Sequence, residues 1–63
     1  MPASPAAKRV DELRAEVGYR RQRLDIYRAR LYGGRTANRA RLEDYEKEHA
    51  RAVERLRAAE AEL

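Results

Sequence analysis

The sequence has no cysteine, tryptophan or phenylalanine, and it has one histidine among its 63 residues. Without cysteine, it offers neither a disulfide framework nor a thiolate metal site. The lone His49 leaves no cluster of imidazoles for a metal ion. A chain this short rarely builds a core that is stable without a disulfide, a metal or a partner. We therefore expect no cofactor and no metal, and a protein that needs a partner for stability.

Long apolar runs are also absent, because no unbroken apolar run exceeds about three residues. Such runs are far shorter than the core of a signal peptide or a membrane-spanning helix. We expect a cytoplasmic protein that does not bind membranes. Residues 1–4 are predicted to be a short disordered lead-in.

Charged residues make up 41% of the chain, and the net charge is +4. Thirteen of the fifteen basic residues are arginine. Arginine enrichment is expected in a GC-rich genome, and it is also typical of proteins that bind phosphate or carboxylate groups. Residues 20–41 hold eight arginines and one acid, Asp25, a net charge of +7, so the other residues carry −3. A hairpin would therefore have a basic turn end and a mildly acidic open end.

Two clear helix signals bracket a glycine pair. Ser4 can cap a helix, and Pro5 suits the first helical position because its missing N–H costs nothing there. Gly33, followed by Gly34, can adopt the left-handed conformation that closes a helix, and Thr36 can cap a second one. The predicted elements are helix 5–32, turn 33–36 and helix 37–62, which form one domain over residues 5–63.

Apolar residues recur at alternating steps of three and four in both predicted helices. This heptad spacing predicts an all-α fold, a two-helix antiparallel coiled-coil hairpin. The seam comprises Val10, Leu13, Val17, Leu24, Tyr27 and Leu31 in the first helix, and Leu42, Tyr45, Ala52, Leu56, Ala59 and Leu63 in the second.

The two seams can be aligned through the turn. Folding back near residues 34–35 pairs positions whose numbers sum to 69, so that apolar layers meet as far as Ala6 with Leu63. The polar gaps of the two seams, Arg20 and His49, then share one layer. That polar layer could fix the register, bind an anion or a proton, or lie exposed; Arg20 could also reach out to Glu16. With no nucleophile and no orienting carboxylate in the layer, catalysis is not expected.

A second apolar stripe follows the opposite side of the first helix. Its residues are either scattered exposed side chains or a packing face for another helix, and we favour the packing face. Two hairpins could then pair into a four-helix bundle, a two-fold homodimer in which opposite charges meet head to tail. The predicted protein interface consists of Ala15, Tyr19, Gln22, Ile26 and Ala29.

No catalytic motif is present: the sequence lacks a glycine-rich phosphate loop, a Ser/His/Asp set and metal-ligand spacing. We predict that the protein is not an enzyme and has no small-molecule substrate. The basic turn end is a second candidate surface, because arginines contact phosphates and exposed aromatic rings stack on bases. The predicted contacts to nucleic acid or to an acidic partner are Arg21, Arg23, Arg28, Arg30, Tyr32, Arg35, Arg39 and Arg41.

Three functional hypotheses follow. The leading one is a non-enzymatic protein–protein interaction module, a homodimeric hairpin that acts as an adaptor or regulator of another macromolecule. The alternative is an RNA- or DNA-binding hairpin that uses its Arg-rich turn end. The third is a subunit whose core is completed by a larger partner.

Overall fold

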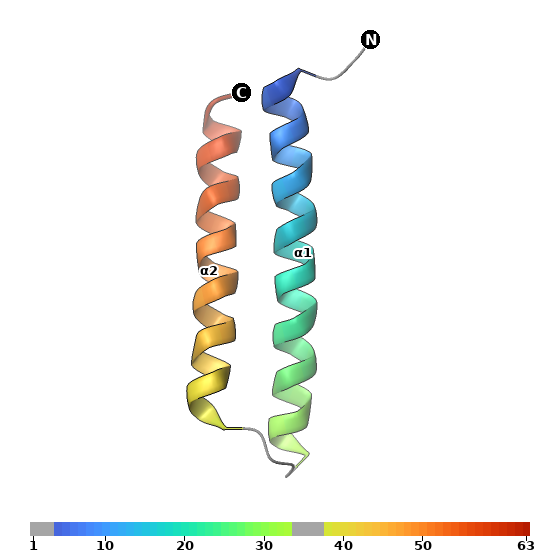
Figure 1. Cartoon of the computed structure of the whole chain (residues 1–63), viewed down its shortest axis with the longest axis vertical. Coiled ribbons are helices and arrows are strands. Elements are labelled where there is room, and N and C mark those ends of the chain that lie inside the picture. Colours follow the sequence, from blue (N-terminus) through green and yellow to red (C-terminus); the bar gives the residue numbers. More distant parts are fainter. Residues whose placement is uncertain (1–3, 34–37) are drawn as a thin grey trace.

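The structure is a computed structural model that describes residues 4–33 and 38–63. It contains two α-helices, α1 (Pro5–Tyr32, 28 residues) and α2 (Arg39–Ala61, 23 residues). The helices lie side by side and antiparallel (Figure 1), in a molecule that measures 50 × 19 × 10 Å. The predicted all-α fold with a two-helix hairpin is therefore confirmed.

Helix α1 begins and ends at the residues that its sequence signals indicate. The Ser4 hydroxyl accepts a hydrogen bond from the Ala7 N–H at 3.1 Å, and Pro5 occupies the first turn. At the other end, the Gly33 N–H donates to the Ala29 carbonyl at 3.0 Å. Gly33 has φ −76° and ψ 1°, so the predicted left-handed closure is wrong. Glycine suits this position for another reason: a Cβ atom would lie only 3.3 Å from the Ala29 carbonyl oxygen.

Helix α2 begins later and ends earlier than the predicted helix 37–62. Its N-cap is Asn38 and not Thr36, since the Asn38 side-chain oxygen accepts a hydrogen bond from the Arg41 N–H at 2.7 Å. Thr36 itself, with most of the predicted turn 33–36, lies outside the described residues. Both residue types cap helices well, and Asn38 has contacts in addition to its cap hydrogen bond.

The contact that distinguishes Asn38 comes from α1. The Tyr27 hydroxyl accepts a hydrogen bond from the Asn38 N–H at 2.8 Å and donates one to the Asn38 carbonyl at 3.2 Å. Tyr27 is itself buried in the seam, and its ring packs against Tyr45 with the centroids 5.0 Å apart. One seam residue of α1 therefore holds the backbone at the start of α2.

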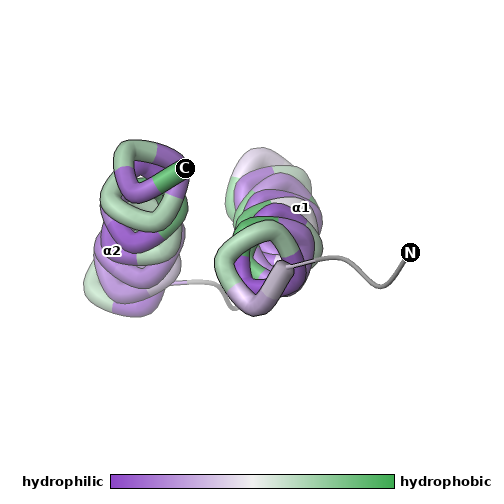
Figure 2. Tube along the Cα trace, turned by 90° about the horizontal axis from the view of Figure 1, so that it is seen from above, coloured by the Kyte–Doolittle hydropathy of each residue, from purple (hydrophilic) through white to green (hydrophobic). Residues whose placement is uncertain are grey.

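The core is thin and lies along the predicted seam. Its buried residues are Val10, Leu13, Leu24, Tyr27 and Ala52, all of them seam positions. Hydrophilic residues cover much of both helices (Figure 2), in keeping with so small a core. The seam opens at the chain ends, where Leu63 is 68% exposed and Ala6 is also exposed. The outermost apolar layer expected from the register, Ala6 with Leu63, is therefore not a buried layer.

At the predicted polar layer, Arg20 reaches acidic side chains of both helices. Arg20 and His49 are both half-buried. The Arg20 guanidinium reaches across to Glu48, with Nη1 3.1 Å from Oε2, and its Nε lies 3.9 Å from the Glu16 carboxylate. The Nε atom is buried without a hydrogen-bond partner. No hydrogen bond joins Arg20 to His49 in the described ranges, so the cross-helix partner is the residue before His49.

Candidate protein interface and basic turn end

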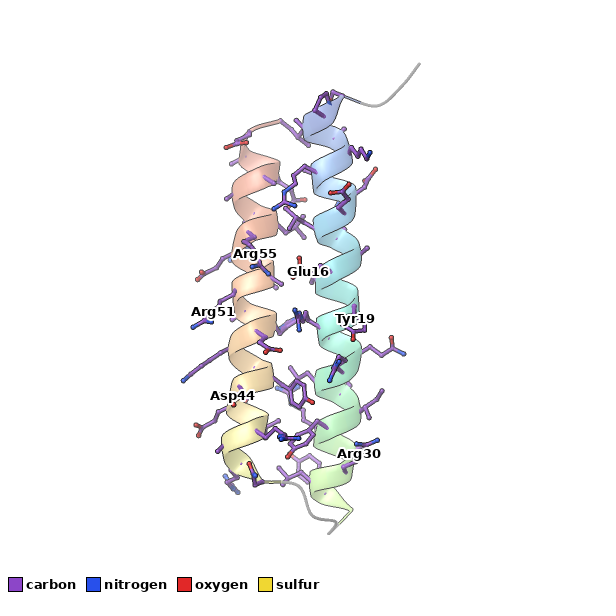
Figure 3. All side chains as sticks on the ribbon, viewed as in Figure 1. Glu16, Tyr19, Arg30, Asp44, Arg51 and Arg55 are labelled. Carbon is purple, nitrogen blue, oxygen red and sulfur yellow. The ribbon has the colours of Figure 1, made fainter. Side chains whose placement is uncertain are left out.

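The predicted protein interface is exposed along the whole length of its stripe. Ala15, Gln22 and Ala29 are exposed, Tyr19 is 52% exposed and Ile26 is 48% exposed. Tyr19 lies near the middle of α1 in Figure 3. The stripe follows the face of α1 opposite the buried seam, because its residues are offset from the seam by about half a helical turn. Helix α2 therefore leaves this face of α1 uncovered.

Ile26 lines two open grooves at the edge of this face. An open groove of about 200 Å³ is lined by Arg23, Ile26, Tyr27, Arg30 and Tyr45. A second, of about 370 Å³, is lined by Ile26, Ala29, Arg30 and Gly33. Ile26 and Arg30 line both grooves. The grooves are open to solvent, which suits a partner's side chain better than an enclosed small molecule.

Arg23 is fixed on the flank of the stripe by two tyrosines. Its guanidinium donates hydrogen bonds to the hydroxyls of Tyr19 (2.8 Å) and Tyr45 (3.2 Å). Its Cζ atom also lies 5.6 Å from the Tyr19 ring centroid and 5.4 Å from that of Tyr45, within the range of cation–π attraction. The hydrogen bonds to Tyr45 and then Tyr19 raise the pKa of Arg23 above its ordinary value. The contacts of Arg23 with Tyr19 and Tyr45 therefore place a fixed positive charge along one edge of the stripe.

Ion pairs between α1 and α2 flank the core. The nitrogen–oxygen distances are 3.2 Å for Arg14–Glu60, 3.1 Å for Arg20–Glu48, 3.4 Å for Arg28–Glu46 and 2.7 Å for Arg55–Glu16. These side chains are between one third and three fifths exposed, so each pair contributes at most about 1 kcal/mol. The pairs bear more on the relative placement of the helices than on their stability.

These ion pairs were not predicted from the sequence, because the register was applied to the apolar and polar seam positions alone. A usable signal was present. Arg20 with Glu48 sums to 68, and Arg55 with Glu16 sums to 71, both close to the 69 of the apolar register. Opposite charges at positions that flank a helix–helix seam pair across it. Applying the register to charged residues would have identified these two pairs.

The predicted basic contacts fall into three groups. Arg28 is engaged with Glu46, and Arg23 with the two tyrosines. Arg35 lies outside the described residues. The remaining members are exposed and hold no ion pair within residues 4–33 and 38–63: they are Arg21, Arg30, Arg39 and Arg41. Tyr32, the last residue of α1, is 86% exposed.

Neither a metal centre nor a spanning segment is found in the part of the chain that the structure describes. No three His, Cys, Asp or Glu side chains there gather closely enough to hold a metal ion. Neither α1 nor α2 has an apolar stretch that could cross a bilayer.

Comparisons of this chain with family models, with curated proteins and with solved structures find no match.

Proposed function

We propose that this chain is a non-enzymatic protein–protein interaction module, a coiled-coil hairpin that self-associates through α1 and acts as an adaptor or regulator. The observation that carries the proposal is the exposure of Tyr19 and Ile26 on the face of α1 turned away from the core. Exposed apolar residues scattered singly are normal. Here they share one face with Ala15 and Ala29, at the spacing of a helix-packing surface.

The thinness of the core supports the same proposal. Among the residues that the structure describes, five side chains are buried, and α2 contributes only Ala52 to them. Small domains with so little buried apolar surface commonly gain stability from oligomerisation when they have no disulfide or metal. Packing the outward stripe against a partner helix would remove Tyr19 and Ile26 from water and extend the core. A four-helix bundle of two hairpins is the arrangement that we propose.

Sedimentation of the purified chain over a concentration series tests the proposal. We expect a two-chain mass that dissociates to one chain on dilution. Ile26→Glu should leave only the one-chain mass at every concentration, with unchanged helicity by circular dichroism, because it places a charge in the apolar contact. Lys47→Glu is a suitable control, since Lys47 is exposed on α2. A one-chain mass for the unaltered protein at all concentrations would refute self-association.

Binding of single-stranded nucleic acid through the turn end is a second candidate function. Tyr32, at the end of α1, is 86% exposed. Arg30 and Arg39, at the same end of the hairpin, hold no ion pair among the described side chains. These two observations favour this function. Guanidinium groups neutralise phosphates, and an exposed ring can stack on an unpaired base. This combination favours single-stranded RNA or DNA over a duplex, whose bases are already stacked.

A matched pair of triple variants tests this second function. Changing Arg30, Arg39 and Arg41 to glutamine should abolish binding to a single-stranded oligonucleotide. Changing Arg9, Arg51 and Arg57 to glutamine removes the same number of positive charges at positions far from the turn end. This control variant should retain most of the binding. Figure 3 labels one residue of each set, Arg30 and Arg51. Affinity should fall by somewhat less than one log unit per contacted phosphate for a tenfold rise in salt. Equal affinities of the two triple variants would refute a site at the turn end.

A further inference from the structure

We infer that the outward stripe is covered by α1 of a second copy of this chain, packed antiparallel, with the two-fold axis beside Gln22. The inference rests on the proposed self-association and adds the orientation, the register and the residues that set them. Three features of the described residues point to it: the symmetry of the stripe, two unpaired charges and a glycine inside α1.

The stripe is nearly symmetric about Gln22. Ala15 and Ala29 each lie seven residues from Gln22, while Tyr19 lies three before it and Ile26 four after it. In an antiparallel pair centred on Gln22, Ala15 therefore faces Ala29 of the second copy, and Tyr19 faces Ile26 of the second copy. The small alanines therefore face each other across the contact, and the half-exposed Tyr19 of each copy faces the half-exposed Ile26 of the other copy. A two-fold contact requires such self-complementarity.

Charge complementarity selects the antiparallel orientation. Glu12 and Arg30 are exposed and hold no ion pair in the described part of the hairpin. They are 18 residues apart, which is about five turns at 3.6 residues per turn, so they lie in one row along α1. Glu12 is ten residues before Gln22 and Arg30 eight after it. The antiparallel pair brings Glu12 of each chain close to Arg30 of the other, because residues on the same edge of the stripe meet in an antiparallel pair and lie on opposite sides of the contact in a parallel one.

Gly18 supports a close approach on the same face. It lies inside α1, where glycine costs about 1 kcal/mol relative to alanine. A Cβ atom at this position would have no atom within 4 Å, so packing inside the hairpin does not require glycine. Gly18 lies one helical turn before Gln22 at the edge of the stripe. The absent side chain leaves room for the backbone of a second helix near the proposed axis.

The outer face of α2 cannot provide the same contact. Its exposed residues include Glu43, Lys47, Glu54 and Arg57, with no large apolar side chain among them. The dimer contact is therefore formed by α1 alone. One helix face per chain buries less than the roughly 800 Å² per partner of a standard interface. We therefore expect a weak dimer, with a dissociation constant of about 1 μM or higher.

Single cysteines give a direct test, because the chain has none of its own. Under mild oxidation, Gln22→Cys should form a disulfide-linked dimer, since the axis brings the two copies of residue 22 together. Ala15→Cys alone should not link to itself. A mixture of Ala15→Cys and Ala29→Cys chains should give the mixed dimer. A parallel pair would instead link each of the three variants to itself.

Charge exchange at Glu12 and Arg30 tests the register independently. Arg30→Glu alone and Glu12→Arg alone should each weaken association by about threefold to tenfold, because like charges then meet twice in the dimer. The double variant restores both pairs and should recover the unaltered affinity. Arg57→Glu, on the outer face of α2, should have no effect. Helicity measured for each variant separates lost association from lost folding.

The outcomes separate this inference from the proposal on which it rests. A two-chain mass with self-linking of Ala15→Cys would overturn the antiparallel register and leave self-association standing. A two-chain mass with no link at residues 15, 22 or 29 would overturn the α1 contact. A one-chain mass at all concentrations would overturn self-association and the inference together, and would leave the stripe to a different protein.

Discussion

The Tyr27 hydroxyl is hydrogen-bonded to both backbone polar groups of Asn38, accepting from its N–H at 2.8 Å and donating to its carbonyl at 3.2 Å. A buried side chain of α1 thereby satisfies the backbone of the residue that caps α2. The Asn38 carbonyl also accepts the hydrogen bond of the Leu42 N–H at 3.2 Å. The seam and the first turn of α2 are therefore coupled at this point.

Removing that hydroxyl should destabilise the hairpin without a loss of packing. Tyr27→Phe leaves the Asn38 N–H without its α1 partner, and we expect the free energy of unfolding to fall by about 1 kcal/mol. Urea titration followed by circular dichroism measures it. Tyr32→Phe is the matched control, because Tyr32 is 86% exposed. Equal stabilities of the two variants would show that the hydroxyl does not anchor α2.

Leu13 should be among the most sensitive core positions. It is only 2% exposed. Leu13→Ala should cost about 2–5 kcal/mol, the range for truncating a buried leucine. This is comparable with the whole stability expected of a core this small, so the variant should be largely unfolded at room temperature by circular dichroism. Leu63→Ala, at a position 68% exposed, should change stability by less than about 0.5 kcal/mol.

We expect the polar layer of Arg20 and His49 to lower the stability of the hairpin while it fixes the register between the two helices. Arg20→Leu combined with His49→Leu replaces two half-buried polar groups, including the Arg20 Nε that has no hydrogen-bond partner. Apolar replacement of such groups is often stabilising, so we expect a higher melting temperature. A lower melting temperature would mean that the Arg20–Glu48 pair contributes more than its exposure suggests.

Gly18→Ala should stabilise the isolated hairpin. The added methyl group has open space around it, and alanine is favoured over glycine by about 1 kcal/mol in a helix interior. The measurement is best made in the Ile26→Glu background, where self-association should not contribute. Ala15→Gly in the same background is the reverse change on the same helix and should destabilise by a similar amount. A loss of stability on Gly18→Ala would indicate a contact within the hairpin that requires glycine.

The heptad spacing was sufficient to predict the two helices and the residues between them. All five residues that are buried in the described helices, from Val10 to Ala52, are seam positions, because helical periodicity decides which side chains can face a neighbouring helix. The exposure of Tyr19 and Ile26 follows from the same geometry. Their use as an interface does not, since exposure alone does not specify a partner.

Most of the details that escaped prediction depend on long-range contacts. Thr36 and Asn38 are both good capping residues, and the observed cap, Asn38, is hydrogen-bonded to the hydroxyl of Tyr27, eleven residues before it. Gly33, by contrast, is a local difference: it ends α1 with φ −76° and ψ 1°, so its backbone does not adopt the left-handed conformation that glycine permits. The division of the arginines into paired and unpaired ones depended on where the acids of α2 lie in space.

Pro5 and Ala61, the first and last helical residues, lie together at one end of the hairpin, and the C-terminal end of α1 and the N-terminal end of α2 lie at the other (Figure 1). A label or a fused protein attached at either terminus would therefore project away from Arg30 and Arg39. In an antiparallel dimer, two such attachments would sit at opposite poles, separated by roughly the length of a helix.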